Sequence, residues 1–139
     1  MTPTLPSRMH KQIGVAVIDR QGKILIDRRR AEGDLGGLWE FPGGKIEPGE
    51  TIEECIKREI EEELNIQIAV GDRLTTITHA YENFNVTLYV HICHHLSGEP
   101  QPLECEEIRW VEANCLNRYQ FPVANIQIIE LLQTRGVDQ

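Results

Sequence analysis

The chain has 139 residues, of which 40% are hydrophobic and 26% are charged, and its formal net charge at pH 7 is −8. This size and composition fit one soluble globular domain with one core. The acidic balance disfavours a general nucleic-acid surface, which should be basic, and no apolar run approaches the roughly 20 residues that span a bilayer, so we expect neither a nucleic-acid nor a membrane partner.

Residues 1–10 are expected to form a flexible tail, because Pro3 and Pro6 interrupt the segment. The segment also lacks the apolar core of a secretory signal. A single domain is expected over residues 11–135. The four cysteines contain no C-x-x-C pair, which disfavours a zinc site, and a chain of this size needs no disulfide bonds. We therefore expect reduced thiols in a cytoplasmic protein.

Two strands are expected at the start of the domain. The apolar, β-branched run QIGVAVID at residues 12–19 predicts a buried strand, and after a DRQG turn KILIDRR at residues 23–29 predicts a second. Residues 30–44 contain five glycines and a proline. They are predicted to form a loop, and a loop of this length suggests a functional role.

A helix is predicted to begin near Thr51, where Thr51 and Glu54 have the spacing of a capping box. Its apolar positions recur at helical spacing and should form the buried face; they are Ile52, Cys55, Ile56 and Ile60. Asn65 should end the helix, because asparagine tolerates the left-handed conformation of a helix terminus.

The second half of the chain predicts a sheet and a final helix. Strand-like segments occur at residues 66–71, 74–81, 83–96 and 107–111, and residues 121–136 predict a helix with Pro122 at its entry and Gly136 past its end. Strands and helices do not alternate regularly, so a mixed sheet with packed helices is expected. Within these segments, His91, His94 and His95 are expected at an edge or on the surface, and Trp110, like Trp39 earlier in the chain, is expected to pack.

The segment from Gly43 to Ile66 contains eight Glu and only three Lys or Arg. Glu59, Glu62 and Glu63 lie at i, i+3 and i+4, so on a helix their side chains share one face and repel one another. A solvated acidic face is one interpretation. A site for a hard divalent cation is the other, and we favour it because Mg²⁺ prefers carboxylate and other oxygen ligands.

Two further features of the segment bear on this choice. Arg58 can act as a counter-ion for Glu62 on the helix or for Glu50 just before it. The glycine pair at residues 43–44 lets the backbone approach a ligand closely, and a carbonyl there could add a metal ligand.

The whole segment resembles the Nudix box, G-x5-E-x7-R-E-U-x-E-E-x-G-U, where U is aliphatic. The matching positions are Gly44, Glu50, Arg58, Glu59, Ile60, Glu62, Glu63 and Ile66. Asn65 replaces the glycine of the pattern, and the turn should survive because asparagine is the next best residue there. The resemblance implies a hydrolase that cleaves a nucleoside diphosphate linked to another moiety, with an α/β/α sandwich fold around a mixed sheet.

The resemblance also implies roles for individual residues. The metal, Mg²⁺ or Mn²⁺, would be held by the carboxylates of Glu59, Glu62 and Glu63 and by the Gly44 carbonyl. Glu50 and Arg58 would form a structural ion pair.

Catalytic roles are implied as well. Lys45 would meet a phosphate, and Arg58 would support the catalytic set. Glu59 is one candidate for the general base. Glu104 is another, because ECEEIRW at residues 104–110 resembles a late segment in which related enzymes carry an extra metal-binding or basic Glu; the alternative is an ordinary loop acid.

Two other segments, LWEFPGGK at residues 38–45 and FPVAN at residues 121–125, resemble the MutT branch of 8-oxo-dGTP diphosphatases. By that likeness Asn125 would hydrogen-bond the oxidised guanine, Phe41 would pack against the base and Arg29 would lie near it. The alternatives are a helix cap for Asn125, a core position for Phe41 and a solvated loop for Arg29. Val123 departs from the branch, which has proline there.

We therefore expect a monomeric, Mg²⁺-dependent pyrophosphohydrolase that acts on a small-molecule nucleotide, converts 8-oxo-dGTP to 8-oxo-dGMP and pyrophosphate, and serves nucleotide-pool sanitation, mutation avoidance and DNA repair. One alternative is a Nudix enzyme for a normal dNTP, ADP-ribose or a nucleotide sugar. The other is a non-catalytic module that senses a nucleotide or reads a DNA lesion.

Overall fold

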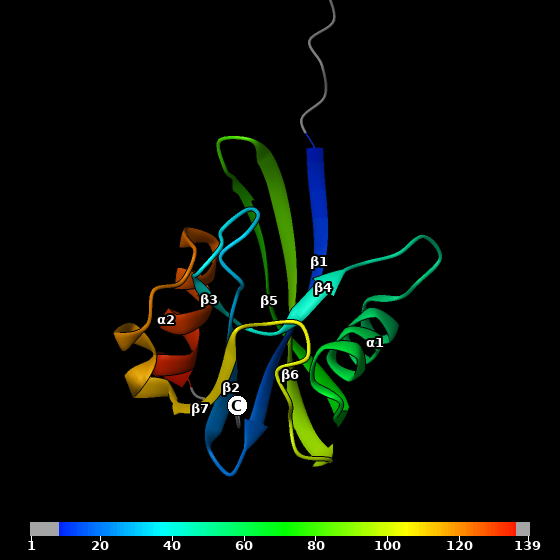
Figure 1. Ribbon diagram of the computed structural model, residues 1–139, viewed down its shortest axis with the longest axis vertical. Coiled ribbons are helices and arrows are strands. Elements are labelled where there is room, and N and C mark those ends of the chain that lie inside the picture. The colour runs from blue at the N-terminus through cyan, green and yellow to red at the C-terminus, as the bar shows by residue number, and fades with distance from the viewer. Residues whose placement is uncertain (1–8, 136–139) are drawn as a thin grey trace, which may run out of the picture.

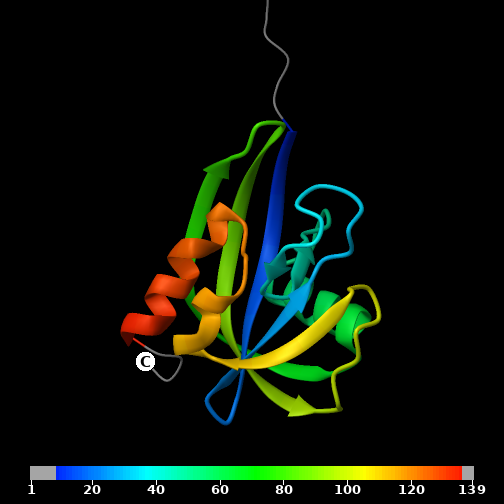
Figure 2. The same cartoon turned by 60° about the vertical axis from the view of Figure 1, so that its left-hand side comes forward.

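The computed structural model describes residues 9–135, which form a mixed sheet with helices on both of its faces (Figures 1 and 2). The strand order is β3-β2-β1-β6-β5, with β4 paired to β1 and β7 paired to β2. Strands β1 and β6 are parallel, and the other strand pairs are antiparallel. The strands are β1 Met9–Arg20, β2 Lys23–Arg28, β3 Trp39–Glu40, β4 Gly43–Lys45, β5 Gln67–Ala80, β6 Phe84–Ser97 and β7 Glu107–Glu112.

Helix α1, Ile52–Leu64, covers one face of the sheet, and helix α2, Ile126–Arg135, covers the other (Figure 1). Two short 3₁₀ helices, Ala113–Arg118 and Val123–Asn125, precede α2. The structure thus confirms the α/β/α sandwich predicted from the sequence.

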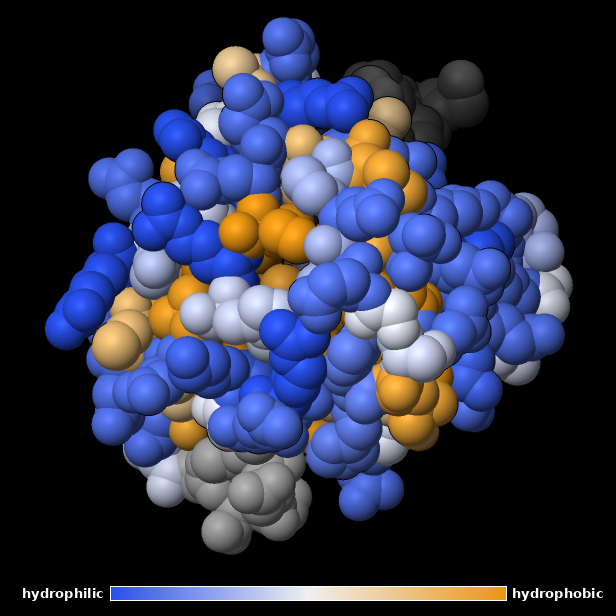
Figure 3. Space-filling model, turned by 60° about the horizontal axis from the view of Figure 1, so that its bottom comes forward, coloured by the Kyte–Doolittle hydropathy of each residue, from blue (hydrophilic) through white to orange (hydrophobic). Residues whose placement is uncertain are grey.

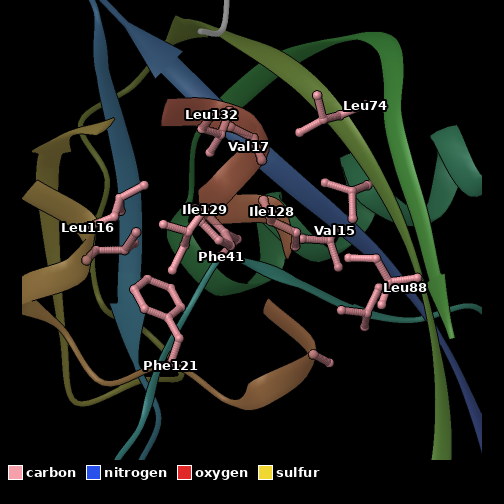
Figure 4. Packing of buried hydrophobic residues seen from close by; sticks show 14 of the residues in the cluster. Val15, Val17, Phe41, Leu74, Leu88, Leu116, Phe121, Ile128, Ile129 and Leu132 are labelled. Atoms are coloured by element: carbon pink, nitrogen blue, oxygen red, sulfur yellow. The ribbon is translucent and has the colours of Figure 1, made fainter. Parts of the chain in front are cut away.

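Strand alternation divides the core into two layers. Val15 and Val17 of β1 belong to the apolar cluster on the α2 side, whereas Ala16 and Ile18 belong to the cluster on the α1 side. Successive side chains of a strand point to opposite faces, so the continuous apolar run of β1 supplies both layers. Figure 4 shows the α2 side, where residues of α2 pack against the sheet.

The ends of α1 are set by local chemistry. Thr51 Oγ1 accepts a hydrogen bond from the Glu54 amide at 3.1 Å, and a Glu54 carboxylate oxygen accepts one from the Thr51 amide at 2.9 Å. Asn65 adopts the left-handed conformation, with φ 56° and ψ 41°, and its N–H donates to the Glu61 carbonyl. The predicted start and end of this helix are both confirmed.

The predicted loop at residues 30–44 is wrong in part, because it contains strands β3 and β4. Both are too short to show alternation, and they form only by pairing with β2 and β1. The two strands predicted at residues 66–71 and 74–81 are one strand, β5, whose register shifts between Val70 and Thr75. Gly71 and polar neighbours at these shifts mimic the sequence signal of a turn.

The predicted ends of the chain also differ from the structure. Residues 1–8 of the predicted tail and Gly136 lie outside the described residues, while Met9 and His10 begin β1. Helix α2 begins at Ile126 rather than at residue 121, because a 3₁₀ turn follows Pro122.

The face shown in Figure 3 is mostly hydrophilic, with several small groups of hydrophobic side chains among the polar ones. Trp39 is buried and packs edge-to-face against Tyr119, while Trp110 contacts the His95 ring and the Arg20 guanidinium. Within residues 9–135, no helix is long and apolar enough to cross a membrane.

Candidate functional site

The glycine pair of β4 brings the backbone against α1 and β1. A Cβ atom on Gly44 would lie 2.1 Å from Cδ of Glu59, and one on Gly43 would lie 2.0 Å from the carbonyl oxygen of Gly14. Gly43 has no room for a side chain, and at Gly44 a side chain would displace the Glu59 carboxylate. Gly44 therefore lets the Glu59 carboxylate pack directly on the β4 backbone.

Arg58 links the loop before α1 to the acidic face of the helix. Its Nε and Nη2 atoms donate to the two carboxylate oxygens of Glu50 at 2.6 and 2.9 Å, and its Nη1 atom donates to Glu59 at 2.9 Å and to Glu62 at 3.3 Å. Nη2 also donates to the Lys45 carbonyl at 3.1 Å. The hydrogen bonds from Arg58 lower the pKa of Glu50 to about 2, and those to Glu50 and Glu59 raise the pKa of Arg58. Both groups are thus charged at neutral pH.

Glu63 contacts Glu59 of this network and lies beside two carboxylates that the sequence analysis missed. One ligand oxygen each from Asp27, Glu40 and Glu63 lies within 4.8 Å of the other two. Burial, with the nearby charges of Asp27 and Glu40, raises the pKa of Glu63 to about 10. Burial and the Glu40 carboxylate also raise the pKa of Asp27.

Alternation explains why Asp27 reaches this position. Ile24 and Ile26 of β2 belong to the α2-side cluster and Leu25 to the α1-side cluster, so Asp27 shares the face of Leu25 and points towards α1. Aspartate is depleted in strands, and its place at the end of an apolar run was the available signal.

Glu104 lies in the same cleft as Glu63 and Asp27, together with Arg30 and Cys105. The structure thus brings Glu104 to the carboxylate cluster from the segment between β6 and β7. Lys45 is exposed and does not line this cleft.

A second cleft adjoins the first. Phe41 and Asn125 line it, together with Tyr81, which follows β5, and Phe84, the first residue of β6. Both clefts share three residues, Arg29, Glu40 and Gly43. An apolar cleft with a few polar groups therefore adjoins the carboxylate cluster along a shared wall.

The residues of this second cleft are held firmly. Asn125 is 9% exposed, and Phe41 is buried and stacks on Phe121 with ring centroids 5.1 Å apart. The Tyr81 hydroxyl accepts a hydrogen bond from the Ala124 amide at 3.0 Å, next to Asn125. Arg29 Nη1 donates to Glu40 at 3.1 Å, at the boundary between the clefts.

The histidines and cysteines lie outside these contacts, apart from Cys55 and Cys105. His91 hydrogen-bonds the Gly71 carbonyl at 2.9 Å, and His94 is exposed near Asp19. All four thiols are free, and Cys55 Sγ donates to the Gly44 carbonyl at 3.4 Å.

Comparison with known proteins decides the family. The family model described as NUDIX domain matches residues 14–131. The chain belongs to the Nudix family. It is 34% identical over 121 residues to the CTP pyrophosphohydrolase of Escherichia coli (strain K12), covering 86% of this chain and 88% of the relative.

Other Nudix relatives are equally similar. The chain is 33% identical over 123 residues to the 8-oxo-dGTP diphosphatase of Escherichia coli (strain K12), covering 88% of this chain and 95% of the relative. The solution structure of the MutT Nudix hydrolase from methicillin-resistant Staphylococcus aureus 252 is 32% identical, with a TM-score of 0.76, and covers 94% of this chain and 100% of that one.

Nudix hydrolases generally need a divalent metal. The donors in this chain fit such an ion, because the acidic face of α1 offers carboxylate oxygens, and Asp27 Oδ1 is buried without a hydrogen-bond partner among the described residues. Hard oxygen donors of this kind suit Mg²⁺ or Mn²⁺ better than a thiophilic metal.

Proposed function

We propose that this Nudix enzyme is a Mg²⁺-dependent nucleoside triphosphate pyrophosphohydrolase whose preferred substrate is 8-oxo-dGTP, which it converts to 8-oxo-dGMP and pyrophosphate. The observation that carries the proposal is the wall that the two clefts share: the buried Asn125 lines one cleft, Glu63 and Glu104 line the other, and Arg29 lines both. Removal of oxidised nucleotides from the precursor pool would prevent mutation.

Asn125 is proposed to select the base. Its amide offers both a donor and an acceptor to the edge of a purine. Because Asn125 is almost fully buried, a base that leaves its amide unpaired would incur a desolvation penalty. Phe41 forms an apolar wall of the same cleft, and Arg29 stands where the base and the phosphates would meet.

The catalytic metal is proposed to bind the carboxylates of Glu59, Glu62 and Glu63 and the Gly44 carbonyl. When bound, the metal neutralises phosphate oxygens and activates a water molecule. Arg58 orients Glu59 and Glu62 through its Nη1 atom. Lys45, exposed beside the glycine pair, would approach a phosphate from the solvent side.

We assign the acceptor of the water's proton to Glu104. Glu59 already accepts a hydrogen bond from Arg58 and packs on Gly44, which restricts its carboxylate. Glu104 lines the cleft without such a contact among the described residues. Glu104→Gln should lower kcat far more than it raises KM, because a general base contributes about 10²–10⁴-fold.

A second candidate is a pyrimidine triphosphate, because a relative that is 34% identical is a CTP pyrophosphohydrolase. The test is hydrolysis of 8-oxo-dGTP beside dGTP, CTP, dCTP, ATP and ADP-ribose, with and without Mg²⁺, scored for monophosphate and pyrophosphate. The proposal expects the highest kcat/KM for 8-oxo-dGTP. Preferential turnover of CTP or dCTP would support the second candidate instead.

Variants make the test sharper. Asn125→Ala should reduce the preference for 8-oxo-dGTP over dGTP by about 100-fold, and the exposed Asn114→Ala is the matched control. Glu62→Gln should abolish turnover of every compound. If wild-type protein binds nucleotides but hydrolyses none with Mg²⁺, the chain is a sensing module and the proposed activity is wrong. A cytoplasmic location and a monomeric state stay predictions.

A further inference from the structure

The pairing of β2 with β3 places two carboxylates directly opposite each other. In the antiparallel register Asp27 is the partner of Glu40, and Trp39 and Phe41, on either side of Glu40, belong to the α2-side cluster. Glu40 and Asp27 therefore share the α1 face of the sheet. Like charges directly opposite in a strand pair are destabilising, so this pairing needs compensation.

Helix α1 adds a third carboxylate to the pair instead of a cation. Glu63 brings its ligand oxygen within 4.8 Å of those of Asp27 and Glu40. Oxygen ligands lie about 2.0–2.6 Å from a bound Mg²⁺ or Ca²⁺ ion, so oxygens up to about 5 Å apart can share one. The spacing allows the three carboxylates to share one ion, and all three side chains line one cleft.

When all three carboxylates are ionised, the protein balances their charge only in part. Among the ion pairs of residues 9–135, only Arg29–Glu40, at 3.1 Å, reaches the three carboxylates. Asp27 is 1% exposed, and its Oδ1 atom has no hydrogen-bond partner within the described part of the chain. A buried carboxylate oxygen without a partner is costly, and it points to a ligand that supplies positive charge.

We propose that Asp27, Glu40 and Glu63 hold a hard divalent cation, Mg²⁺ or Mn²⁺, at a position separate from the one proposed for Gly44, Glu59 and Glu62. Glu63 would be shared between the two positions. Asp27 and Glu40 come from the sheet and lie outside the Nudix box. The sheet therefore supplies two of the three ligands and helix α1 supplies the third. Cation binding here does not depend on which nucleotide the enzyme hydrolyses.

The experiment is a Mn²⁺ titration of the metal-free full-length chain without nucleotide, in which electron paramagnetic resonance measures free Mn²⁺. Wild-type protein is compared with Asp27→Asn, which keeps the size of the side chain, and with Glu40→Gln. The exposed Asp72→Asn is the matched control. Circular dichroism establishes whether each variant is folded. If Asp27→Asn does not fold, Glu40→Gln still tests the proposal.

The proposal expects Asp27→Asn and Glu40→Gln each to lose one Mn²⁺ per chain, or to bind it at least about tenfold more weakly, since even outer-shell partners of a metal contribute that much. Asp72→Asn should match wild type, and Glu62→Gln should retain this ion. If both folded variants bind Mn²⁺ with unchanged stoichiometry and affinity, the proposal is wrong. A proton shared among the three carboxylates would then explain the cluster instead. Because no nucleotide is present, this outcome is independent of the hydrolysis assay.

Discussion

Arg58 donates two hydrogen bonds to Glu50, at 2.6 and 2.9 Å, across the loop that joins β4 to α1. The pair is bidentate, which is the strongest geometry for an Arg–carboxylate contact. Because Arg58 also donates to Glu59 and Glu62, the ion pair fixes the guanidinium that orients both helix carboxylates. Substitution of Glu50 should therefore lower both the stability and the activity of the protein.

Glu50→Gln should make stability depend differently on pH. The pKa of Glu50 falls from 4.5 to about 2 on folding, so its contribution is fully present above about pH 4.5 and is lost as the pH falls towards 2. The Tm difference between wild type and Glu50→Gln should be largest above pH 5 and should close towards pH 2 in thermal melts. The exposed Glu61→Gln is the control, and a difference that stays constant with pH would contradict the prediction.

Alanine at the two neighbouring glycines should have opposite consequences. At Gly44 the added Cβ meets the flexible end of Glu59, so the protein should fold while the carboxylate moves and kcat/KM falls by about 100-fold. At Gly43 the Cβ meets the Gly14 backbone, which cannot move aside, so folding itself should be impaired. Thermal melts and hydrolysis assays on both variants check this; equal stability losses would contradict it.

Tyr81→Phe should loosen the segment that carries Asn125. The substitution removes the oxygen that accepts a hydrogen bond from the Ala124 amide, and it should lower the free energy of unfolding by about 1 kcal/mol. Discrimination between bases should fall with little change in kcat, because the substitution does not alter the carboxylates of the proposed metal site. Urea unfolding and the ratio of kcat/KM values for 8-oxo-dGTP and dGTP measure the two effects. The prediction fails if discrimination is unchanged.

Thr51→Ala should remove the capping box of α1. The Glu54 amide loses its acceptor, and the cost should be about 0.5–2 kcal/mol of unfolding free energy. Thr51→Ser keeps the hydroxyl and should restore most of that loss, as measured by urea unfolding. A Ser variant as unstable as the Ala variant would show that the cap is not the cause.

The features that could be predicted from the sequence are those set by neighbouring residues. Thr51 and Glu54 interact three residues apart, and Asn65 ends the helix through its own backbone conformation. The face shared by Glu59 and Glu62 follows from helix geometry in the same way. The choice between Glu50 and Glu62 as the partner of Arg58 stayed open in the sequence, and the structure shows that Arg58 reaches both.

The features that could not be predicted depend on pairing between distant segments. Asp27 faces Glu40 only because β2 pairs with β3 in one register, and β3 has two residues, too few to show a periodic pattern. The cleft between Tyr81 and Asn125 likewise joins segments about 40 residues apart. These contacts require the assembled sheet, which local propensity does not specify.

The boundary shared by the two clefts has an evolutionary consequence. A substitution at Arg29 or Glu40 should alter substrate choice and turnover together, because each of these residues lines both clefts. Tyr81 and Asn125, on the far wall, do not line the carboxylate cleft. New base preferences should therefore arise by mutation of the far wall, which leaves the hydrolytic machinery unchanged while the specificity diverges.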